Sequence, residues 1–338
     1  MCRPAPRCPD CPGNPRGVPL VIGLPDAETF EAAERGEVVL GGCVLDPGPI
    51  PEWACPECRE PLRWTTPPVA APAAGRLRIA TWNLRSCPVP WSERGEEISV
   101  WQDEVGADVW LLTEVHRDWR SPAGWVEVSP PRGGAPDHRR WAAVQTHLPV
   151  TPVHDGPTGP AAAEESLCLV RVHLPGPRSV LVACSVLPWG GAARSWPGLP
   201  ERYLDRQQAF VLAHHADRIE QARDGDEPVV WGGDFNQALR RLTPERTAAG
   251  YRVPGTVAGI DRLRAAFERF GLVPLTGDAE HLDPHTPAID HLAVSATLAA
   301  GAAAVHRPHR EDGSLLSDHA AYTADVRVDA LHPEPAAG

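Results

Sequence analysis

From residue 76 onward, apolar residues fall into short runs, and most of these runs end at a glycine, a proline or a polar side chain. Short apolar or alternating runs bounded in this way are typical of buried β-strands. They predict strands in LRIATWNL (77–84), DVWLLTEV (108–115), EPVVWGGDFNQAL (227–239), PAIDHLAVS (287–295) and LLSDHAAYTADVRV (315–328). Pro/Gly-rich loops separate three further strand-like segments, as in a β-meander. These are WAAVQTHL (141–148), SLCLVRVHL (166–174) and SVLVACSVL (179–187).

Longer segments between these strands show the periodicity of amphipathic helices. The segment 203–222 places its apolar residues largely on one face and its charged residues on the other. DRLRAAFERFG (261–271) and the stretch from Glu97 to Val105 predict two more helices. The alternation of strands and helices predicts an α/β domain that covers residues 76–328, followed by a tail at 329–338.

Polar residues stand at the ends or beginnings of five of the predicted strands. Each of them alone fits a structural role, such as a turn cap, an ion pair with arginine or a hydrogen bond to a backbone carbonyl. Carboxylates beside buried strands are costly unless they are paired or bound to a metal. Five strands that converge on one rim would gather these side chains into a single acidic pocket. The residues are Asn83, Glu114, Asp234, Asn236, Asp290, Asp318 and His319.

The residue types in this pocket point to chemistry on phosphate. Asn and Glu with one or two Asp offer hard oxygen ligands, which suit Mg²⁺ or Mn²⁺ better than zinc. A nearby Asp can take a proton from water, and a His held as imidazolium by a second Asp can meet the charge that develops on phosphate. The glycines before Asp234, Gly232 and Gly233, predict that a phosphate approaches the backbone there. Hydrolysis of a phosphate ester is the expected reaction.

Six of the nine cysteines lie in the first 58 residues, and four of them form two Cys-x-x-Cys pairs. Two such turns point four sulfurs at one centre, and this region contains no histidine, so the pattern predicts a structural zinc site made of cysteine alone. A redox Cys-x-x-Cys pair is the alternative. Cys43 is ambiguous between a ligand and a buried thiol, and Cys2 has no partner at ligand spacing. The predicted ligands are Cys8, Cys11, Cys55 and Cys58.

The segment between the two pairs predicts a strand, a short helix from about Asp26 that ends before Gly36, and a second strand. This order resembles a bacterial zinc-ribbon-like module, with GEVVLGGCV as its most distinctive part. Such ribbons bind nucleic acid or protein partners. The module is expected to cover residues 1–63, and residues 64–75 are rich in Pro and Ala, which predicts a semi-rigid linker.

The composition narrows the possible activities. All 32 basic residues are arginine, which excludes Schiff-base enzymes, phosphate-loop NTPases and ordinary kinases because each of these needs a lysine. The formal net charge is −12 and no region is a basic arm, so a nucleic-acid substrate would need a local arginine-lined groove or a bound cation. The sequence lacks a secretory signal and any run of the ~20 apolar residues that span a membrane, which predicts a cytoplasmic protein without membrane partners.

Five short motifs, taken in order, resemble those of one family. TWNL, LLTEV, GGDFN, IDHLAVS and SDHAAY look like the motifs of the endonuclease/exonuclease/phosphatase superfamily. This superfamily includes pancreatic deoxyribonuclease, abasic-site endonucleases, sphingomyelinases and inositol polyphosphate 5-phosphatases. The resemblance covers residues 76–328. It implies a four-layered α/β sandwich, in which two mainly antiparallel sheets pack face to face with helices outside.

The resemblance also implies roles for residues at the strand ends. Asn83 and Glu114 would bind the divalent cation, together with Asp318. Asp234 would orient or deprotonate the attacking water, and Asn236 would position the water and the phosphate.

The remaining two members of the set would act on the phosphate itself. His319 would contact the scissile phosphate, and Asp290 would pair with its imidazole. The central strand departs from the pattern, because the family commonly places a His or Tyr there that contacts the phosphate. In VACSVLPW this position is filled by Ser185 or Val186. The loop that follows offers stand-ins, unless it simply packs on the fold. They are Trp189, Arg194 and Trp196.

The expected activity is a divalent-metal-dependent phosphodiesterase that acts on nucleic acid, with the zinc module recruiting the substrate or a protein partner. A phosphomonoesterase of inositol or lipid phosphates is the alternative within the same chemistry. A catalytically inactive scaffold that binds a partner through the zinc module is the alternative from a different class. The intact strand-end set argues against the scaffold, because a dead site has no reason to retain costly acids.

Overall fold

The computed structural model describes residues 8, 11, 15–23, 25–41, 53–62, 75–120, 124–153, 160–174, 178–192, 196–199, 203–251, 253–283, 285–298, 301–310 and 312–328. The chain divides into two compact units, Met1–Ala70 and Ala71–Gly338. The predicted linker at 64–75, apart from Gly75, and the predicted tail at 329–338 lie outside the described residues. Among the described residues, no helix combines the length and the apolar content that crossing a membrane requires.

The small unit is built on a four-stranded sheet with the order β2-β1-β3-β4. One helix, α1 (Ala27–Glu34), connects β1 to β2, and Asp26 caps it by accepting a hydrogen bond of 2.8 Å from Thr29 N. The crossover through this helix lets β1 and β2 run parallel. The predicted order of strand, helix and strand is confirmed. The strands are β1 (Val18–Val21), β2 (Val39–Leu40), β3 (Trp53–Ala54) and β4 (Pro61–Leu62).

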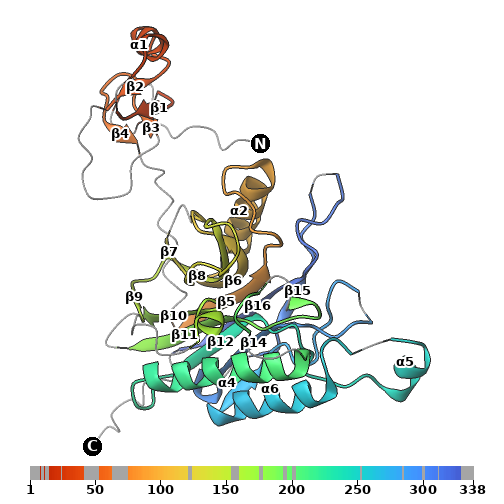
Figure 1. Cartoon of the computed structure of the whole chain (residues 1–338). Coiled ribbons are helices and arrows are strands. Elements are labelled where there is room, and N and C mark those ends of the chain that lie inside the picture. Colours follow the sequence, from red (N-terminus) through yellow and green to blue (C-terminus); the bar gives the residue numbers. More distant parts are fainter. Residues whose placement is uncertain are drawn as a thin grey trace, which may run out of the picture. The chain divides into compact units, whose positions relative to one another are not determined.

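Two six-stranded sheets form the centre of the large unit (Figure 1). The first sheet, in the order β15-β16-β5-β6-β8-β7, contains β5 (Arg76–Asn83), β6 (Val109–His116), β7 (Trp125–Val128), β8 (Arg139–Thr146), β15 (Ala304–His306) and β16 (Ala321–Arg327). The second sheet, in the order β13-β14-β12-β11-β10-β9, contains β9 (Val150–Pro152), β10 (Leu167–His173), β11 (Ser179–Val186), β12 (Val229–Asp234), β13 (Leu272–Pro274) and β14 (Asp290–Ser295). The pairs β5–β6 and β11–β12 are parallel, and the sheets are otherwise antiparallel.

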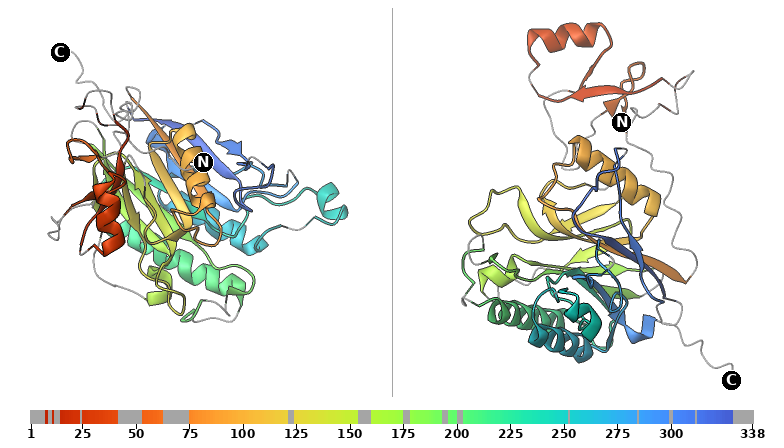
Figure 2. Two further views of the ribbon diagram at one scale, coloured as in Figure 1. Left: turned by 90° about the horizontal axis from the view of Figure 1, so that it is seen from above. Right: turned by 90° about the vertical axis from the view of Figure 1, so that its right-hand side faces the viewer.

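Helices flank the two sheets and give the large unit four layers (Figure 2). They are α2 (Glu93–Val105), α3 (Ala161–Glu164), α4 (Leu204–Ala222), α5 (Pro244–Ala248), α6 (Val257–Arg269) and a 3₁₀ helix at Ala296–Leu298. α2 covers the first sheet, whereas α4 and α6 lie side by side over the second (Figure 1). This arrangement confirms the four-layered α/β sandwich with a small zinc-ribbon-like unit.

The periodicity of the helices explains which face each of them buries. In α4, Val211 and Ile219 pack on the second sheet, and the charged residues point mainly to solvent. The helices expected at 203–222 and 261–271 are confirmed by α4 and α6. α2 begins at Glu93 rather than near Glu97, because the Ser92 side chain caps it from the preceding turn.

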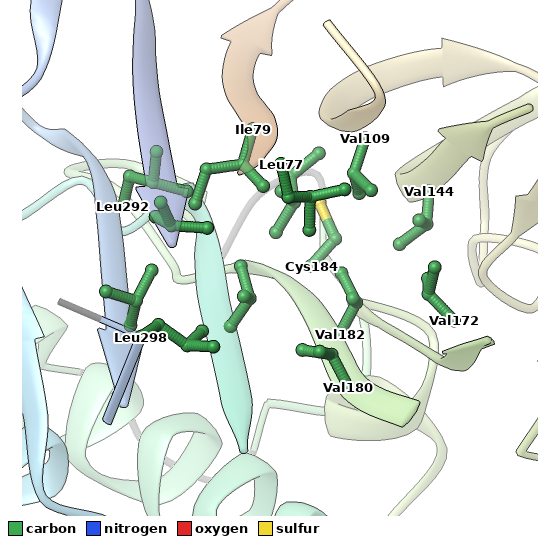
Figure 3. Close-up of a cluster of buried hydrophobic side chains, with 14 of the residues drawn as sticks. Leu77, Ile79, Val109, Val144, Val172, Val180, Val182, Cys184, Leu292 and Leu298 are labelled. Carbon is green, nitrogen blue, oxygen red and sulfur yellow. The ribbon is translucent and has the colours of Figure 1, made fainter. Parts of the chain in front are cut away.

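The main hydrophobic core contains side chains of both sheets (Figure 3). Leu77 and Ile79 of β5 belong to it together with Val182 and Cys184 of β11 and Leu292 of β14. Because side chains alternate along a strand, the other face of each sheet is left to pack under its helices. Burial on both faces accounts for the nearly continuous apolar runs that predict these strands.

The three segments expected to form a meander do not all lie in one sheet. β10 and β11 form an antiparallel pair in the second sheet, but β8 belongs to the first sheet, between β6 and β7. The meander is therefore wrong at β8. This strand is buried along nearly its whole length, so its apolar pattern suits either sheet and does not specify a partner.

Candidate active site

The strand-end residues come together at one rim of the large unit, where ends of both sheets meet. Asn83 ends β5 and Asp234 ends β12, in different sheets, yet Asn83 Nδ2 donates a hydrogen bond of 3.0 Å to Asp234 Oδ2. Asp290 begins β14 and lies directly opposite Asp234 in the antiparallel pair of β12 and β14. The end of one strand and the start of its antiparallel neighbour meet at the same edge of a sheet. The structure thus gathers carboxylates that are distant in sequence.

Glu114 lies at the same rim, on the strand next to Asn83. Its Oε1 accepts a hydrogen bond of 3.4 Å from Asn83 Nδ2, and its Oε2 accepts one from the backbone N–H of Ser86. Although it belongs to β6, Glu114 has a φ of 52°, in the left-handed region. Such a conformation costs a non-glycine residue about 1–3 kcal/mol and is typical of functional sites. The strained backbone turns this carboxylate toward Asn83.

The turn after Asn83 holds two of these side chains in place. Residues 85–87 all have positive φ values, between 52° and 61°. The backbone N–H of Arg85 donates to Asn83 Oδ1 at 2.7 Å, and the next N–H along the chain is the one that binds Glu114. The Arg85 side chain also lies 3.5 Å from Asp318 Oδ2. One short turn therefore connects Asn83, Glu114 and Asp318.

Asp234 is buried, and its surroundings raise its pKa to about 7. Burial is the largest cause, and the negative charge of Asp290 adds to it, whereas His319 and the backbone N–H of Asn236 act in the opposite direction. The Asn236 N–H donates to Asp234 Oδ1 at 2.9 Å. A carboxyl group with a pKa near neutrality can both accept and release a proton at pH 7.

His319 and Asp290 form a hydrogen-bonded pair. His319 Nδ1 donates to Asp290 Oδ2 at 2.7 Å, and the Asp290 side chain is fully buried, whereas that of His319 is 14% exposed. Burial alone would lower the pKa of His319, but the charge and hydrogen bond of Asp290, helped by Asp234 and Asp318, raise it to about 10. The imidazole is therefore positively charged at neutral pH, and Nε2–H is its remaining donor.

A third side chain that the sequence analysis missed, His281, lies beside this pair. His281 Nε2 is 3.9 Å from Asp290 Oδ2, and its ring centroid is 5.1 Å from that of His319. Ligand atoms of the three residues lie within 4.8 Å of one another, a spacing that a metal ion could bridge. The direct bond between His319 and Asp290 already occupies the facing atoms, so we interpret the group as a hydrogen-bonded pair with His281 beside it. His281 belongs to the loop between β13 and β14, which has no apolar pattern, and its nearness to Asp290 in sequence was the only signal.

The glycines before Asp234 serve strand packing. Gly233 has a φ of 127°, and a Cβ at this position would clash with the backbone oxygen of Ser185 on β11. A Cβ on Gly232 would lie 2.8 Å from the backbone oxygen of His291 on β14. Neighbouring strands occupy the space beside both glycines, so the expectation that a phosphate approaches the backbone here is wrong.

Comparison with known proteins assigns the large unit to a family. The model of the Endonuclease/Exonuclease/phosphatase family matches residues 80–319, which span β5 to His319 and include every strand-end residue described above. The chain belongs to the endonuclease/exonuclease/phosphatase family. Membership in this family indicates a phosphoester-hydrolysing enzyme. None of the curated proteins compared with the chain matches it.

Solved structures share the fold of this family member. An AP endonuclease from Archaeoglobus fulgidus matches with a TM-score of 0.53 and 17% identity, over 73% of this chain and 98% of that one. The AP endonuclease LMAP from Leishmania major matches with a TM-score of 0.52 and 15% identity, over 77% and 89% of the two chains. An endonuclease/exonuclease/phosphatase protein from Beutenbergia cavernae DSM 12333 matches with a TM-score of 0.50 and 20% identity, over 75% and 72%. At these identities the likeness establishes the fold.

This member of the family has no His or Tyr at the end of the central strand β11. Val186 pairs with Asp234, and the buried Ser185 accepts a hydrogen bond of 2.7 Å from a tryptophan of β12. The Leu187 N–H donates to the Asp234 backbone oxygen, and its own oxygen accepts from Asn236 Nδ2 at 2.9 Å. These residues position Asp234 and Asn236, and a contact to phosphate must come from another segment.

The three residues expected to replace that contact have different surroundings. Trp196 is only 1% exposed, stacks on Trp141 at a centroid distance of 4.6 Å, and donates from Nε1 to Ala162 O at 3.0 Å, so it packs on the fold. Trp189 is half-buried at the edge of the same cluster, 5.4 Å from Trp141. Arg194 lies outside the described residues.

The donor atoms at the rim fit a hard divalent cation. Asn83 Oδ1 and the carboxylates of Glu114 and Asp318 are all oxygen donors, which Mg²⁺ and Mn²⁺ prefer. Asp318 has a side chain that is 55% exposed, so the group is open to water on one side. Mg²⁺ usually keeps several of its waters, and an open set of this kind suits it.

The four cysteines of the small unit form one cluster. Their sulfurs lie within 4.8 Å of one another, with 3.8 Å between Cys8 and Cys58 and 3.7 Å between Cys11 and Cys55. A tetrahedral zinc with Zn–S bonds of about 2.3 Å separates its sulfurs by about 3.8 Å. The described cysteines are all free of disulfides, and the distances fit a closed four-cysteine metal site better than a redox pair. Outside the described residues lie Cys2 and Cys43.

Proposed function

We propose that the large unit is a divalent-metal-dependent phosphodiesterase that hydrolyses nucleic acid. The observation that carries this proposal is the hydrogen bond of 3.0 Å between Asn83 and Asp234. It joins the oxygen ligands of one sheet to the buried carboxylates of the other. Either group alone fits a structural role, whereas the two together supply a cation site, a proton acceptor and a charged imidazole within one pocket.

In this proposal Asn83, Glu114 and Asp318 hold Mg²⁺ or Mn²⁺. When bound there, the cation would polarise a phosphoryl oxygen and offset its negative charge. The turn at 85–87 fixes two of the ligands through its backbone N–H groups, so little rearrangement accompanies binding.

Asp234 is the residue that we assign to the attacking water. Its pKa of about 7 lets it accept a proton from water near neutral pH. Asn236 donates from Nδ2 to Leu187 O at 2.9 Å, which leaves its side-chain oxygen to orient the water. The bond between the Asn236 N–H and Asp234 Oδ1, at 2.9 Å, keeps the two side chains together.

His319 and His281 are the residues that we assign to the phosphate. Asp290 holds His319 as an imidazolium, which can meet the negative charge that develops on the phosphate. His281 takes the place of the missing His or Tyr of the central strand. Burial lowers its pKa, so it is neutral at pH 7, and its Nε2 is buried without a hydrogen-bond partner among the described residues. An unsatisfied polar atom in such a position fits a ligand contact.

Support for a nucleic-acid substrate comes from the structures that share the fold, because two of them are AP endonucleases. A phosphomonoesterase of inositol or lipid phosphates would use the same reaction centre. Diesters and monoesters of p-nitrophenol separate the two activities, and an inactive scaffold would hydrolyse neither.

The test is hydrolysis by the full chain with Mg²⁺ or Mn²⁺. We expect release of p-nitrophenol from bis-p-nitrophenyl phosphate and cleavage of DNA or RNA oligonucleotides, with both lost in EDTA and in Asp234→Asn. Asp325→Asn is the matched control, because it removes the same charge from an exposed ion pair with Arg78 on the same two-sheet unit. Hydrolysis of monoesters alone, or equal rates in Asp234→Asn and Asp325→Asn, would contradict the proposal.

We propose that the small unit holds one structural zinc ion. The sulfur distances of 3.7 and 3.8 Å are the observation that carries this assignment. Elemental analysis of the purified chain should find about one zinc, and the double variant Cys8→Ser/Cys58→Ser should lose it. Protein purified without a chelator and free of zinc would refute the assignment.

A further inference from the structure

The start of β8 borders the reaction centre. The register between β6 and β8 pairs Thr113 with Ala142 and Val115 with Arg140, on either side of Glu114, and pairs Arg139 with His116. Directly opposite residues on antiparallel strands lie about 4.5–5.5 Å apart. Side chains at the beginning of β8 and in the loop before it are therefore neighbours of the proposed cation site.

Arg132, in the loop between β7 and β8, is held in a fixed position beside this strand. Its guanidinium lies over the ring of Trp141, 3.3 Å from the ring centroid. Trp141 in turn stacks on the buried Trp196 at 4.6 Å, so the platform under the guanidinium cannot move easily. Cys87, the last residue of the ligand-holding turn, is close enough to act on the charge of Arg132, and its thiol donates to Arg140 O at 3.7 Å. A stacked guanidinium keeps its in-plane N–H groups for a partner at its edge.

Among the described residues, no carboxylate oxygen lies within 4.0 Å of a nitrogen of Arg132 or Arg139, although acids outnumber arginines in this chain, 44 to 32. Glu114 and the buried Glu165 act on the charge of Arg132 from farther away. Both are half-buried, and the Nε atoms of both are buried without a hydrogen-bond partner in the described part of the chain. Arginines elsewhere pair with acids, as Arg269 does with Asp217 and Glu220. Buried donors of a charged group are costly when unpaired.

Arg132 also interacts electrostatically with Arg139 and with Glu114 of the reaction centre. Burial lowers the pKa of Arg132, and Arg139 reinforces that effect, whereas Cys87 and Glu114 oppose it. Arg139 lies two residues before Trp141 on β8, so its side chain is on the same face of the strand as the ring that carries Arg132. Two positive charges on one face repel each other unless an anion lies beside them. A phosphate diester offers two acceptor oxygens to such a pair.

We propose that Arg132 and Arg139 form a subsite that binds a phosphate of the nucleic-acid strand next to the one being cleaved. This inference rests on the proposed function. It also explains how a chain with a net charge of −12 attracts a polyanion, because the attraction comes from two arginines beside the cation site rather than from the whole surface. The ligand is a backbone phosphate diester, and the subsite recognises strands that extend beyond the scissile bond.

The first experiment measures binding without hydrolysis. A fluorescein-labelled single-stranded oligonucleotide of twelve nucleotides is titrated with the full chain carrying Asp234→Asn, and anisotropy gives the Kd. Adding Arg132→Leu or Arg139→Leu should raise the Kd about tenfold, as expected for one charge-assisted hydrogen bond. The slope of log K against log salt should fall by about 0.7 for each arginine removed.

The matched control is Arg76→Leu. Arg76 is exposed at the opposite end of β5 from Asn83, and seven steps along a strand cover about 23 Å. This variant loses the same charge and should bind as tightly as its parent. If Arg132→Leu and Arg139→Leu also bind like the control, the subsite does not exist. Tight binding of inositol hexakisphosphate without binding of the oligonucleotide would overturn the assignment to a nucleic-acid strand.

The second experiment distinguishes failure of this inference from failure of the proposed function. In chains with an intact Asp234, the loss of kcat/KM in Arg132→Leu should be larger for an oligonucleotide than for bis-p-nitrophenyl phosphate, which has no second phosphate. Hydrolysis of both by the wild type with equal losses in the variant would reject the subsite and keep the phosphodiesterase. Absence of hydrolysis in the wild type would reject the phosphodiesterase, while the anisotropy result would still decide the subsite.

A conservative variant separates binding from folding. Arg132→Lys keeps the charge but loses the planar group that stacks on Trp141 and forks toward phosphate. It should recover part of the affinity lost in Arg132→Leu, with thermal melting of both variants close to that of the wild type. Equal loss of affinity in both, together with a lowered melting temperature, would assign Arg132 to the packing of Trp141 and overturn its place in the subsite.

Discussion

The cysteine cluster of the small unit and the strand-end site of the large unit both gather ionisable side chains from distant segments, but they differ in how they meet water. Four sulfurs at spacings near 3.7 and 3.8 Å leave no ligand position open. In the strand-end site, the exposure of the side chains to water varies. Asp290 is fully buried, whereas the side chain of Asp318 is 55% exposed. A closed set of metal ligands stabilises a fold. A site that is open to water on one side can admit a substrate, and its buried members can take up or release protons.

The surroundings of the two sites explain this difference. The described part of the small unit buries few side chains, among them Cys8, Cys55, Val39 and Ala54. Units with so little core usually rely on a staple such as a metal site, and the cluster of four cysteines offers one. The large unit has extensive apolar clusters between its sheets and under its helices, so it can bear the cost of burying two neighbouring carboxylates, Asp234 and Asp290, at one rim. Substitutions at the two sites should therefore have opposite consequences for stability and activity.

The largest effect is expected from Cys55→Ser. Loss of one ligand should release the zinc and unfold the small unit, because metal binding and folding are coupled in such modules. The large unit should keep its own melting transition and its hydrolysis of bis-p-nitrophenyl phosphate. Zinc content, limited proteolysis and the diesterase assay measure these properties. If the variant retains zinc and resists the protease, the four-cysteine cluster does not hold the small unit together, and this prediction is wrong.

Asp234→Asn should have the reverse outcome. The kcat for a phosphodiester should fall by about 10³-fold, since general base catalysis contributes about 10²–10⁴. The melting temperature should rise or stay unchanged, because the substitution removes a buried charge that Asp290 repels. Steady-state kinetics and differential scanning fluorimetry, with Asp325→Asn as control, give both values. A destabilised variant with full activity would assign Asp234 to structure alone.

A smaller effect is expected at His281. His281→Asn should lower kcat/KM about tenfold, the equivalent of one hydrogen bond to a charged group. His285 belongs to the same loop but is exposed, and its ring lies against Tyr251 at 5.2 Å, so His285→Asn is the matched control and should remain fully active. Similar rates of hydrolysis in His281→Asn and His285→Asn would contradict the contact between His281 and the phosphate.

The smallest effect is a dependence of stability on pH that comes from two histidines of the core, unlike the positively charged His319 of the site. His215 and His291 are buried, and burial lowers their pKa to about 3 and about 4. In the unfolded chain these histidines take up a proton near pH 6.5, whereas in the folded chain they stay neutral. The free energy of unfolding is therefore unaffected above pH 6.5, and it falls as the pH drops from 6.5 toward the folded-state pKa of each histidine. Each should cost about 1 kcal/mol per pH unit in that window.

Urea unfolding of the full chain at pH 7, 6 and 5 measures this loss. His215→Gln should reduce the dependence on pH, because the variant removes one group that takes up a proton on unfolding. Asp234, whose pKa is raised to about 7, adds stability as the pH falls through the same window and partly offsets the histidines, so the comparison with the variant isolates His215. An equal dependence on pH in the wild type and in His215→Gln would contradict the neutral state of His215 in the folded chain.

Local patterns were sufficient to locate most elements and most of the site. The runs that end at Asn83, Glu114 and Asp234 predict strands with polar ends, and the structure ends two strands at Asn83 and Asp234, while β6 continues two residues beyond Glu114. The spacing within each Cys-x-x-Cys pair likewise predicts the cysteine cluster. These signals are reliable because strand periodicity, helix periodicity and turn chemistry depend on neighbours in the sequence.

Other features depend on contacts between segments far apart in the chain, and no local pattern carries them. The sheet to which β8 belongs, and the packing role of Gly233 against Ser185, follow from how strands pair. His281 gains its place only because its loop folds back onto Asp290.

The sequence by itself determined that a set of acids, an asparagine and a histidine stand at strand ends, and that four cysteines share a spacing suited to one metal. Only the tertiary structure decided which of them meet. The bond between Asn83 and Asp234 links residues of two different sheets, and the position of Arg132 over the ring of Trp141 follows only from the packing of segments that are separate in the sequence. Burial and charge act through space, so the pKa of Asp234 and the free donors of the arginines are properties of the packed molecule.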